Sequence, residues 1–414
     1  MATVALEELD KEAVKKKYAE ERAKRLRTEG NDQYQRLEGA FGDMGADPHT
    51  PFQERDPVHD HVTFAFIGAG LSGLVVGARL KEAGIDDFRL IEKAGGVGGT
   101  WYWNRYPGVR CDTAAMIYLP LLEETGYMPS EKYVRGPEIL AHCNRIADQY
   151  GLKDKALFQT IVSGVAWQED RKVWRITTNR GDDFTAKYVA MATGLLHIAK
   201  LPGVPGISSF NGKSFHTSRW DYEYTGGDKE GAPMDKLADK RVAVIGTGAT
   251  GVQCIPHLAK SAKELFGFQR TPSSVDTREN HPIDPGWFKD LATPGWQKRW
   301  MDNFVDNMGR GVPTEDLIDD GWTEIARRVR EKVFSLPPDK MNPEGMREAF
   351  ENADLEKMNE IRTRVDHVVS DDTTAQGLKA WYSQLCKRPC FSDEYLPAYN
   401  RPNTTQVNTD GLGV

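Results

Sequence analysis

Two glycine-rich segments, each set between an apolar strand pattern and a periodic helix pattern, place the strongest limit on how this chain can fold. The first follows VTFAFIGAG, from Val62, and leads into LSGLVVGARLKEAG and FRLIEKA; the second begins at Arg241 in RVAVIGTGATGVQ. Each pattern predicts a strand–helix–strand unit of a parallel sheet. We therefore expect an α/β fold with two dinucleotide-binding, Rossmann-like domains.

In the first unit, Gly68, Gly70 and Gly73 form the motif G-A-G-L-S-G. Glycines at these positions permit a tight turn and let backbone N–H groups approach a pyrophosphate at a helix N-terminus. Glu92 follows Gly68 by 24 residues, at the end of the expected second strand. A carboxylate there accepts hydrogen bonds from ribose hydroxyls and repels a 2′-phosphate, so this site is expected to bind FAD or NAD and not NADP.

In the second unit, Gly246, Gly248 and Gly251 form G-T-G-A-T-G, and the position 24 residues after Gly246 is Arg270, followed by Thr271. A guanidinium can pair bidentately with a 2′-phosphate, so this site is expected to bind NADPH. One such motif is weak evidence, because similar turns occur without any nucleotide. Two motifs in the same setting, with opposite charge at the discriminating position, predict a pair of cofactors.

Composition narrows the class of protein and its partners. The chain has 414 residues with 54 basic and 61 acidic side chains, and this balance favours small-molecule partners over nucleic acid or a membrane surface. Five scattered cysteines without C-x-x-C spacing favour a reducing, cytoplasmic compartment, and no metal site is expected. The charged leader, residues 1–30, has the pattern of an exposed helix and not that of a secretory signal or transit peptide.

The remaining segments predict how the domains are arranged. The runs KVWRITTNRG and FTAKYVAMATG predict hairpin strands that return to the first sheet, and a stretch rich in Trp, Lys, Arg and Glu predicts helices inserted in the second domain. The expected regions are an N-terminal helical extension and arm over 1–61, the first part of an FAD-binding domain over 62–205, a linker over 206–235, an NADPH-binding domain over 236–385 with its helical insertion at about 281–371, and a return towards an incomplete FAD domain over 386–414.

A further motif lies in the linker, in the segment FNGKSFHTSRWD. Its defined positions are Phe210, Gly212, His216, Trp220 and Asp221. The segment resembles the fingerprint F-x-G-x-x-x-H-x-x-x-W-[P/D] of the Baeyer–Villiger monooxygenases at every defined position. The resemblance implies that His216 and Trp220 couple domain motion to catalysis, and it assigns no proton transfer to His216.

A second segment, GGTWYWNRYPGVRCD, resembles the flavin-side loop of the same family. It runs from Gly98 to Asp112. The resemblance implies that Gly98, Gly99, Thr100 and Trp101 lie near the isoalloxazine ring, with Asp112 below it.

A third segment, CKRP, starts at Cys386 and resembles the family's active-site segment. The match carries Arg388 over as the active-site arginine and Lys387 as a contact to the NADPH 2′-phosphate. Arg219, inside the fingerprint, is a further candidate for that phosphate. In isolation Lys387 and Arg388 would be interpreted as a solvated surface pair.

The resemblance implies an FAD- and NADPH-dependent enzyme that converts ketones to esters or lactones with O2, after oxygen has added at flavin C4a. A fixed cation beside the oxygen adduct favours its anionic form and the negatively charged adduct with the ketone. Arg388 suits this role because its charge cannot be titrated away, and Asp112 could orient it by a charge-assisted hydrogen bond. The expected partners are a ketone and O2, and the expected state is a monomer. An N-terminal extension resembles members that act on bulky cyclic, steroid or long-chain ketones.

The chain departs from the family pattern at its end, NTDGLGV, where further strands normally follow. We therefore expect a truncated form with an incomplete FAD domain. Three alternatives stay open: a flavin N- or S-monooxygenase, which has a similar fingerprint without the Trp-Asp ending; a flavin disulfide reductase, for which Cys386 and Cys390 are one residue too far apart; and a truncated, non-catalytic dinucleotide-binding protein.

Overall fold

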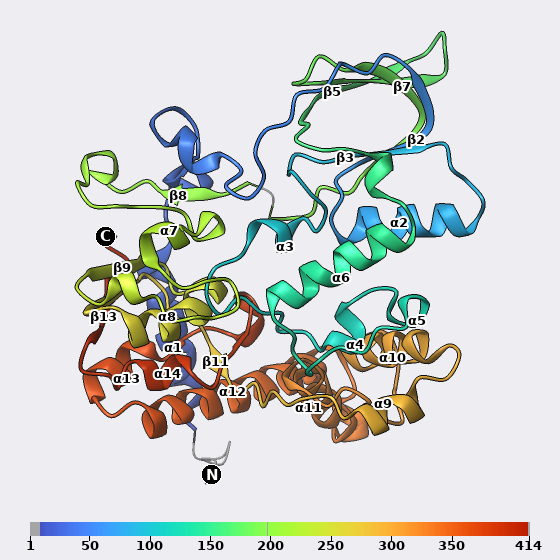
Figure 1. The fold of residues 1–414 in the computed structure, drawn as a ribbon. Helices are drawn as coiled ribbons and strands as arrows, with labels where there is room; N and C mark the ends of the chain where they lie inside the picture. Colours follow the sequence, from blue (N-terminus) through green and yellow to red (C-terminus); the bar gives the residue numbers. More distant parts are fainter. Residues whose placement is uncertain (1–8, 197, 413–414) are drawn as a thin grey trace.

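The computed structural model describes residues 9–196 and 198–412 and contains two open sheets on opposite sides of the molecule (Figure 1). The first is six-stranded, in the order β4-β3-β2-β7-β6-β5. Strands β4, β3, β2 and β7 are parallel to one another, β6 pairs antiparallel with β7, and β5 pairs antiparallel with β6. The runs KVWRITTNRG and FTAKYVAMATG form β6 and β7, which confirms the predicted hairpin strands of the first sheet. The strands are β2 (His61–Ile67), β3 (Phe88–Ile91), β4 (Ala156–Leu157), β5 (Val162–Gln168), β6 (Val173–Thr178) and β7 (Asp183–Met191).

Two helices, α2 (Leu71–Glu82) and α6 (Gly136–Gln149), lie along one face of this sheet (Figure 1). Their apolar sides meet the sheet in the main hydrophobic core, where Leu74, Leu90 and Ile146 are fully buried. This packing fixes the N-terminus of α2 beside the carboxyl ends of the parallel strands. A ligand site is expected at that edge.

The second sheet has three parallel strands in the order β13-β10-β9, namely β9 (Arg241–Ile245), β10 (Glu264–Gln269) and β13 (Thr404–Asn408). Helix α8 (Ala249–Ser261) connects β9 to β10 and buries Ile255 and Leu258. The position of β13 differs from the expectation that residues 386–414 return towards the first domain. Its parallel pairing covers the outer edge of β10, which would otherwise expose unpaired backbone groups.

The helical insertion in the second domain is confirmed, and with it the predicted fold class. Its helices are α9 (Pro285–Leu291), α10 (Trp296–Val305), α11 (Gly321–Phe334), α12 (Pro343–Val368) and α13 (Asp372–Leu378). Helix α10 also contacts the first domain, because the Gln297 amide accepts from Leu122 N at 2.8 Å and donates to Leu119 O at 2.6 Å. The short strands β11 (Val275–Asp276) and β12 (Cys390–Phe391) pair with each other in parallel, and β11 contacts α12.

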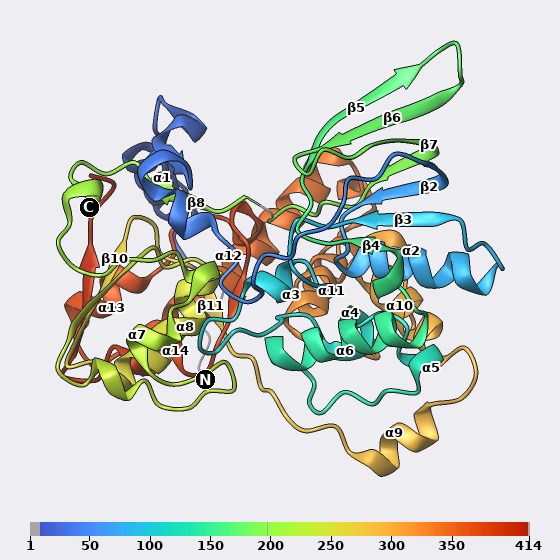
Figure 2. The same ribbon diagram turned by 45° about the horizontal axis from the view of Figure 1, so that its top comes forward.

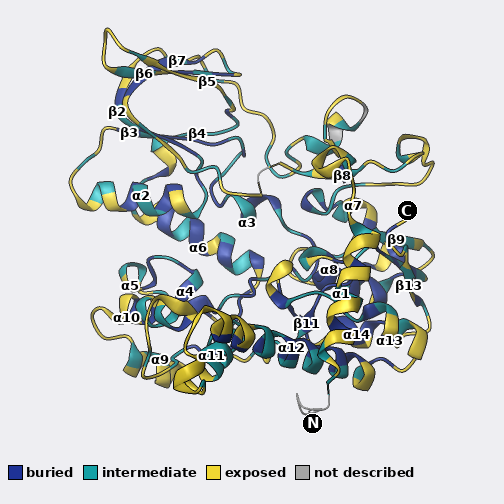
Figure 3. Cartoon of the chain, turned by 180° about the vertical axis from the view of Figure 1, so that it is seen from behind, coloured by how far each residue is buried: buried dark blue, intermediate teal, exposed yellow. Residues whose placement is uncertain are grey.

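The N-terminal extension forms helix α1 (Lys11–Arg25), which runs along the second domain with a mostly exposed outer face (Figure 3). The chain then forms strand β1 (Tyr34–Arg36), which pairs antiparallel with β8 (Lys200–Pro202) in the connection between the two domains, on the same side of the molecule as the second sheet (Figure 2). No helix among the described residues is long and apolar enough to cross a lipid bilayer.

Past β1 the arm turns to the first domain. The Tyr102 hydroxyl donates to Asp47 Oδ2 at 2.7 Å, and Arg55 makes an ion pair of 2.6 Å with Asp182. The arm is therefore attached to the second domain at its start and to the first domain at its end. The remaining short helices used below are α3 (Thr100–Trp103), α4 (Ala115–Tyr118) and α7 (Tyr222–Thr225).

Candidate active site

The first glycine motif forms a turn between β2 and α2 that is closed by backbone on both sides. Gly68 has a φ of +119°, and a Cβ there would lie 2.3 Å from the carbonyl oxygen of Ala192. A Cβ on Gly73 would lie 2.2 Å from the carbonyl oxygen of Gly68, and one on Gly99 would lie 2.9 Å from the Cα of Gly70. No side chain fits at these positions, so the glycines let the helix, the strand and the flavin-side loop approach one another closely.

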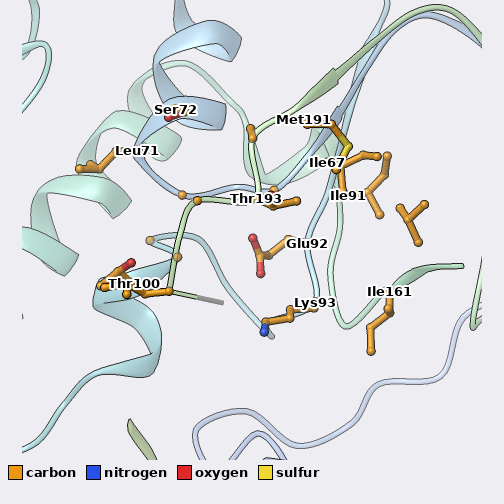
Figure 4. Close-up of a pocket in the computed structure, with 18 of the residues that line it drawn as sticks. Ile67, Leu71, Ser72, Ile91, Glu92, Lys93, Thr100, Ile161, Met191 and Thr193 are labelled. Atoms are coloured by element: carbon orange, nitrogen blue, oxygen red, sulfur yellow. The ribbon is translucent and has the colours of Figure 1, made fainter. Parts of the chain in front are cut away.

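A cavity of about 550 Å³ opens beside this turn. It is lined by the first glycine motif and by the loop that was predicted to lie on the flavin side, so the structure brings these two predicted segments together. Figure 4 shows the Glu92 carboxylate in the middle of the pocket, with Thr100, Thr193 and Lys93 around it. The predicted residues that line the cavity are Gly68, Gly70, Glu92, Gly98, Gly99, Thr100 and Trp101.

Glu92 is buried at the end of β3 and is held by backbone donors. Its two carboxylate oxygens accept hydrogen bonds from Ala69 N at 2.7 Å and Ala94 N at 2.9 Å. Burial raises the pKa of this carboxyl above its ordinary value, although the two backbone donors oppose the shift. Each carboxylate oxygen has further acceptor capacity towards the cavity, which fits the role of accepting ribose hydroxyls.

The second glycine motif forms a similar turn between β9 and α8, but one that is open. Gly246 has a φ of +103°, and a Cβ on it or on Gly248, which precedes the first residue of α8, would meet no atom within 4 Å. Only Gly251 is closely packed, since a Cβ there would lie 2.4 Å from the carbonyl oxygen of Gly246. The N-terminus of α8 therefore has free space before it, which a pyrophosphate can enter.

The strand pairing shows which residue of the second unit corresponds to Glu92, and it is not the one that the residue count predicted. In each unit the N–H of the first motif glycine donates to the residue that precedes the discriminating position, Ile91 in the first and Phe268 in the second. Gln269, and not Arg270, therefore occupies the place of Glu92. The segment between the first motif glycine and this position is one residue shorter in the second unit than in the first. A count of 24 residues from Gly246 therefore reaches one position too far. Gln269 is fully buried and donates to Gly377 O at 2.7 Å.

Arg270 follows directly and belongs to a group of positive charges. Lys387 Nζ donates to the carbonyl oxygens of Thr271 and Pro272, both at 3.3 Å, so the structure brings the predicted Arg270, Thr271 and Lys387 together. Burial lowers the pKa of Lys387 to about 8, and the charges of Arg270 and Arg25 act in the same direction. An anion bound here would relieve this repulsion, so the donor set fits a 2′-phosphate.

Arg219 does not join this group. Its Nε donates to the carbonyl oxygen of Ala46 at 2.9 Å, and its guanidinium lies 3.8 Å from the ring centre of Trp103, in the loop that lines the first cavity. Burial lowers the pKa of Arg219 to about 10. The guanidinium is held by the arm and by stacking on an aromatic ring, so the structure does not bring Arg219 together with Arg270 and Lys387, and its contact to the 2′-phosphate stays a prediction.

The fingerprint packs as a structural connection between the domains. Trp220 is buried and donates to Thr225 Oγ1 at 3.2 Å, and Asp221 caps α7. His216 Nδ1 accepts from Ser218 N at 3.1 Å, and burial lowers the pKa of the His216 ring. A neutral, locally bonded imidazole fits the expected linker role, which stays a prediction. The other two defined positions are exposed: Phe210 and Gly212.

Asp112 and Arg388 lie near each other, but the expected hydrogen bond between them is absent. Arg388 Nη2 is 4.0 Å from Asp112 Oδ2, whereas Arg278 Nη2 donates to Asp112 Oδ1 at 2.7 Å. Burial raises the pKa of Asp112 against the opposing charges of both arginines. Sequence reasoning missed Arg278, since a residue 166 positions away in a loop carries no local signal.

Arg388 is exposed and free to approach a ligand. Its side chain is 56% exposed, and its guanidinium lies 5.4 Å from the ring centre of Trp322. It does not line the first cavity, but its charge acts on the hydroxyl of Tyr118, which does. Among residues 9–196 and 198–412, its one ion pair is the loose contact to Asp112, which leaves most of its hydrogen-bond donors for a ligand.

Residues 65–285 match the pyridine nucleotide-disulphide oxidoreductase family model. A Baeyer–Villiger monooxygenase of Streptomyces coelicolor is 46% identical over 411 residues, which are 97% of this chain and 67% of that protein, and another of Stachybotrys chlorohalonatus, ATR8, is 52% identical over 98% of this chain and 65% of its own length. The polycyclic ketone monooxygenase from Thermothelomyces thermophila has a TM-score of 0.89 at 40% identity, over 97% of this chain and 68% of that one. The chain belongs to the Baeyer–Villiger monooxygenases.

This Baeyer–Villiger monooxygenase chain spans about two thirds of the length of the relatives that it matches. A solved structure of OTEMO in complex with FAD and NADP matches 86% of the chain, and 66% of its own, with a TM-score of 0.68 at 29% identity. The two cofactors that the glycine motifs predict are the two in that complex. No C-x-x-C pair exists in the sequence, so the family match rests on the dinucleotide-binding fold and brings no disulfide chemistry.

Proposed function

We propose that this chain binds FAD in the cavity beside Gly68 and NADPH at the open turn of Gly246, and that it inserts oxygen from O2 beside a ketone carbonyl to give an ester or lactone. The observation that supports this most directly is the contrast between the two turns. One ends in a buried carboxylate, Glu92, and the other in the cationic pair of Arg270 and Lys387. A ribose and a 2′-phosphate need these opposite groups.

The binding residues divide by cofactor. Backbone N–H groups at the start of α2 would receive the FAD pyrophosphate, and Glu92 would accept the ribose hydroxyls. The start of α8 would receive the NADPH pyrophosphate, while Arg270 and Lys387 would bind the 2′-phosphate. When bound and reduced by NADPH, the flavin supplies the chemistry that activates O2.

We assign to Arg388 the role of supplying a positive charge in the reaction. Its guanidinium stays protonated at every accessible pH, so it can stabilise an oxyanion that develops during attack on the ketone carbonyl. Arg278 satisfies the buried carboxylate of Asp112 at 2.7 Å, which leaves the Arg388 donors for the reacting oxygens. The Arg278–Asp112 pair thus keeps Arg388 from being neutralised by a tight ion pair.

The proposed substrates are bulky cyclic ketones. The support is the similarity to a polycyclic ketone monooxygenase over 97% of this chain, including its N-terminal extension. We also propose that the protein acts as a monomer in the cytoplasm. The five cysteines are unpaired, as a reducing compartment requires.

The test is a panel of cyclic and polycyclic ketones incubated with the purified chain, NADPH, O2 and added FAD, with products identified by mass. The proposal expects a product heavier than the ketone by one oxygen atom. A matched reaction with Arg388→Ala should oxidise NADPH without forming that product. A colourless chain that binds no added flavin would instead support the non-catalytic alternative, and an N-oxide or sulfoxide product without ester would support the other monooxygenase class.

A further inference from the structure

The start of the N-terminal extension contacts the 2′-phosphate group of charges from outside the second domain. Arg25 Nε, at the end of α1, donates to the carbonyl oxygen of Arg270 at 2.8 Å. Lys24 makes an ion pair of 3.1 Å with Asp410, just after β13. The last turn of α1 is therefore attached to Arg270, just after β10, and to Asp410, just after the neighbouring strand β13.

Two side chains just after α1 hold the Arg270 guanidinium itself. Gln33 Oε1 accepts from Nη1, and the Tyr34 hydroxyl accepts from Nη2 at 3.2 Å. The amide of Gln33 also donates to Gly30 O, which orients its oxygen towards the arginine. Two of the five N–H donors of Arg270 are used in this way, and the rest remain for a ligand.

The backbone fixes where these two acceptors stand. Tyr34 is the first residue of β1 and pairs with Pro202 of β8, and Gly203 N donates to Gln33 O at 2.8 Å. A Cβ on Gly203 would lie 2.8 Å from that same carbonyl oxygen, so the contact between the arm and the interdomain connection is close. The acceptors are thus carried on a paired strand and not on a free loop.

The arm orients Arg270 without cancelling its charge. Both acceptors are neutral, and within residues 9–196 and 198–412 no carboxylate forms an ion pair with Arg270. Burial lowers the pKa of Lys387 to about 8, and the charge of the neighbouring Arg270 acts in the same direction. An Asp or Glu in the arm would hold the arginine equally well but would repel a phosphate.

We propose that Gln33 and Tyr34 are positioning residues that set the preference for NADPH over NADH by fixing the guanidinium of Arg270. This inference rests on the proposed role of Arg270 as a 2′-phosphate ligand. It assigns a binding function to the arm, which lies outside both dinucleotide folds.

The experiment compares the double variant Gln33→Ala/Tyr34→Phe with Gln35→Ala, a neighbouring exposed glutamine of β1, and with Arg270→Ala. Binding of NADP⁺, NAD⁺ and adenosine 2′,5′-bisphosphate is measured by calorimetry on the full chain, and thermal unfolding confirms that each variant folds. The double variant should weaken the binding of NADP⁺ and of the bisphosphate about tenfold, which is the range expected when a hydrogen bond to a charged group is lost. It should change NAD⁺ less than about twofold, and Gln35→Ala should leave all three affinities unchanged on the same scale.

The outcomes separate this inference from the function on which it rests. If Arg270→Ala removes the preference for NADP⁺ while the double variant keeps it, the arm does not position the arginine. If the double variant binds NADP⁺ more tightly, the arm competes with the phosphate instead of assisting its binding, and the inference is wrong. If Arg270→Ala itself leaves the preference intact, the assignment of the 2′-phosphate site is wrong.

Discussion

The two glycine turns share a sequence pattern but differ in how much of their surroundings is already filled. A Cβ at Gly68 would lie 2.3 Å from a backbone oxygen, whereas a Cβ at Gly246 would meet nothing within 4 Å. The first turn is packed against the residue after β7 and against the flavin-side loop, whereas the second is open at the N-terminus of α8. Similar glycine motifs thus serve two purposes, since glycine at the first turn lets three backbone segments approach one another and glycine at the second leaves space before the helix.

Removal of Arg388 tests whether the reaction depends on anything besides the two turns. Arg388→Ala should lower the rate of ester formation by about 10²- to 10³-fold, the usual loss for one preorganised donor to a developing oxyanion. FAD content and NADPH-driven flavin reduction should stay near their original values, because Arg388 lines neither turn. Product mass and stopped-flow absorbance measure the two quantities separately. An unchanged ester yield would refute the role assigned to this arginine.

Removal of Arg270 tests the charge that distinguishes the second turn. Arg270→Ala should raise the KM for NADPH about 10- to 100-fold, from a loss of about 1.5–3 kcal/mol in hydrogen bonds to a charged group. The KM for NADH should change little, because NADH has no 2′-phosphate. Steady-state kinetics with both cofactors give the comparison, and an equal loss for both would show that Arg270 does not meet that phosphate.

Matched alanine substitutions test the difference in packing. Both Gly68 and Gly246 have positive φ, so Gly→Ala at either should cost about 1–2 kcal/mol of strain in the free energy of unfolding. Gly68→Ala should cost about 1–3 kcal/mol more, because its Cβ overlaps a backbone oxygen. Denaturant unfolding of the two variants measures the difference. Equal losses in the free energy of unfolding would mean that the backbone around Gly68 moves apart to admit a Cβ at no extra cost.

The smallest expected effect is a pair of pH dependences with opposite sign. Lys387 must be protonated to bind a phosphate and its pKa is about 8, so NADPH affinity should be full below pH 8 and fall above it. Glu92 must be ionised to accept ribose hydroxyls and burial raises its pKa, so FAD retention should fall as pH drops through that raised value. Titrations of each cofactor against pH measure both. Lys387→Arg should abolish the alkaline loss, and a loss that persists there belongs to another group.

Much of this architecture follows from local patterns in the sequence. The turns at Gly68 and Gly246 and the hairpin of β6 and β7 were predictable, because glycine spacing and apolar alternation act over a few residues. The hydrogen bond from Arg278 to Asp112 and the contacts from Gln33 to Arg270 were not, because they join residues brought together only by the tertiary fold. The equivalence of Arg270 to Glu92 was wrong by one position for a simpler reason, because a fixed count of residues ignores the length of the connection, whereas the role of Arg270 at the 2′-phosphate stays a prediction.

The arm also limits how far the two domains can move. It is attached to the second domain through Lys24 and Arg25, and to the first domain through Asp47 and Arg55. An extended chain spans at most about 3.3–3.6 Å per residue, so the stretch between these attachments is a tether of finite length. If the two domains rotate relative to each other, a rotation that exceeds the slack of this segment would have to detach one of its anchors.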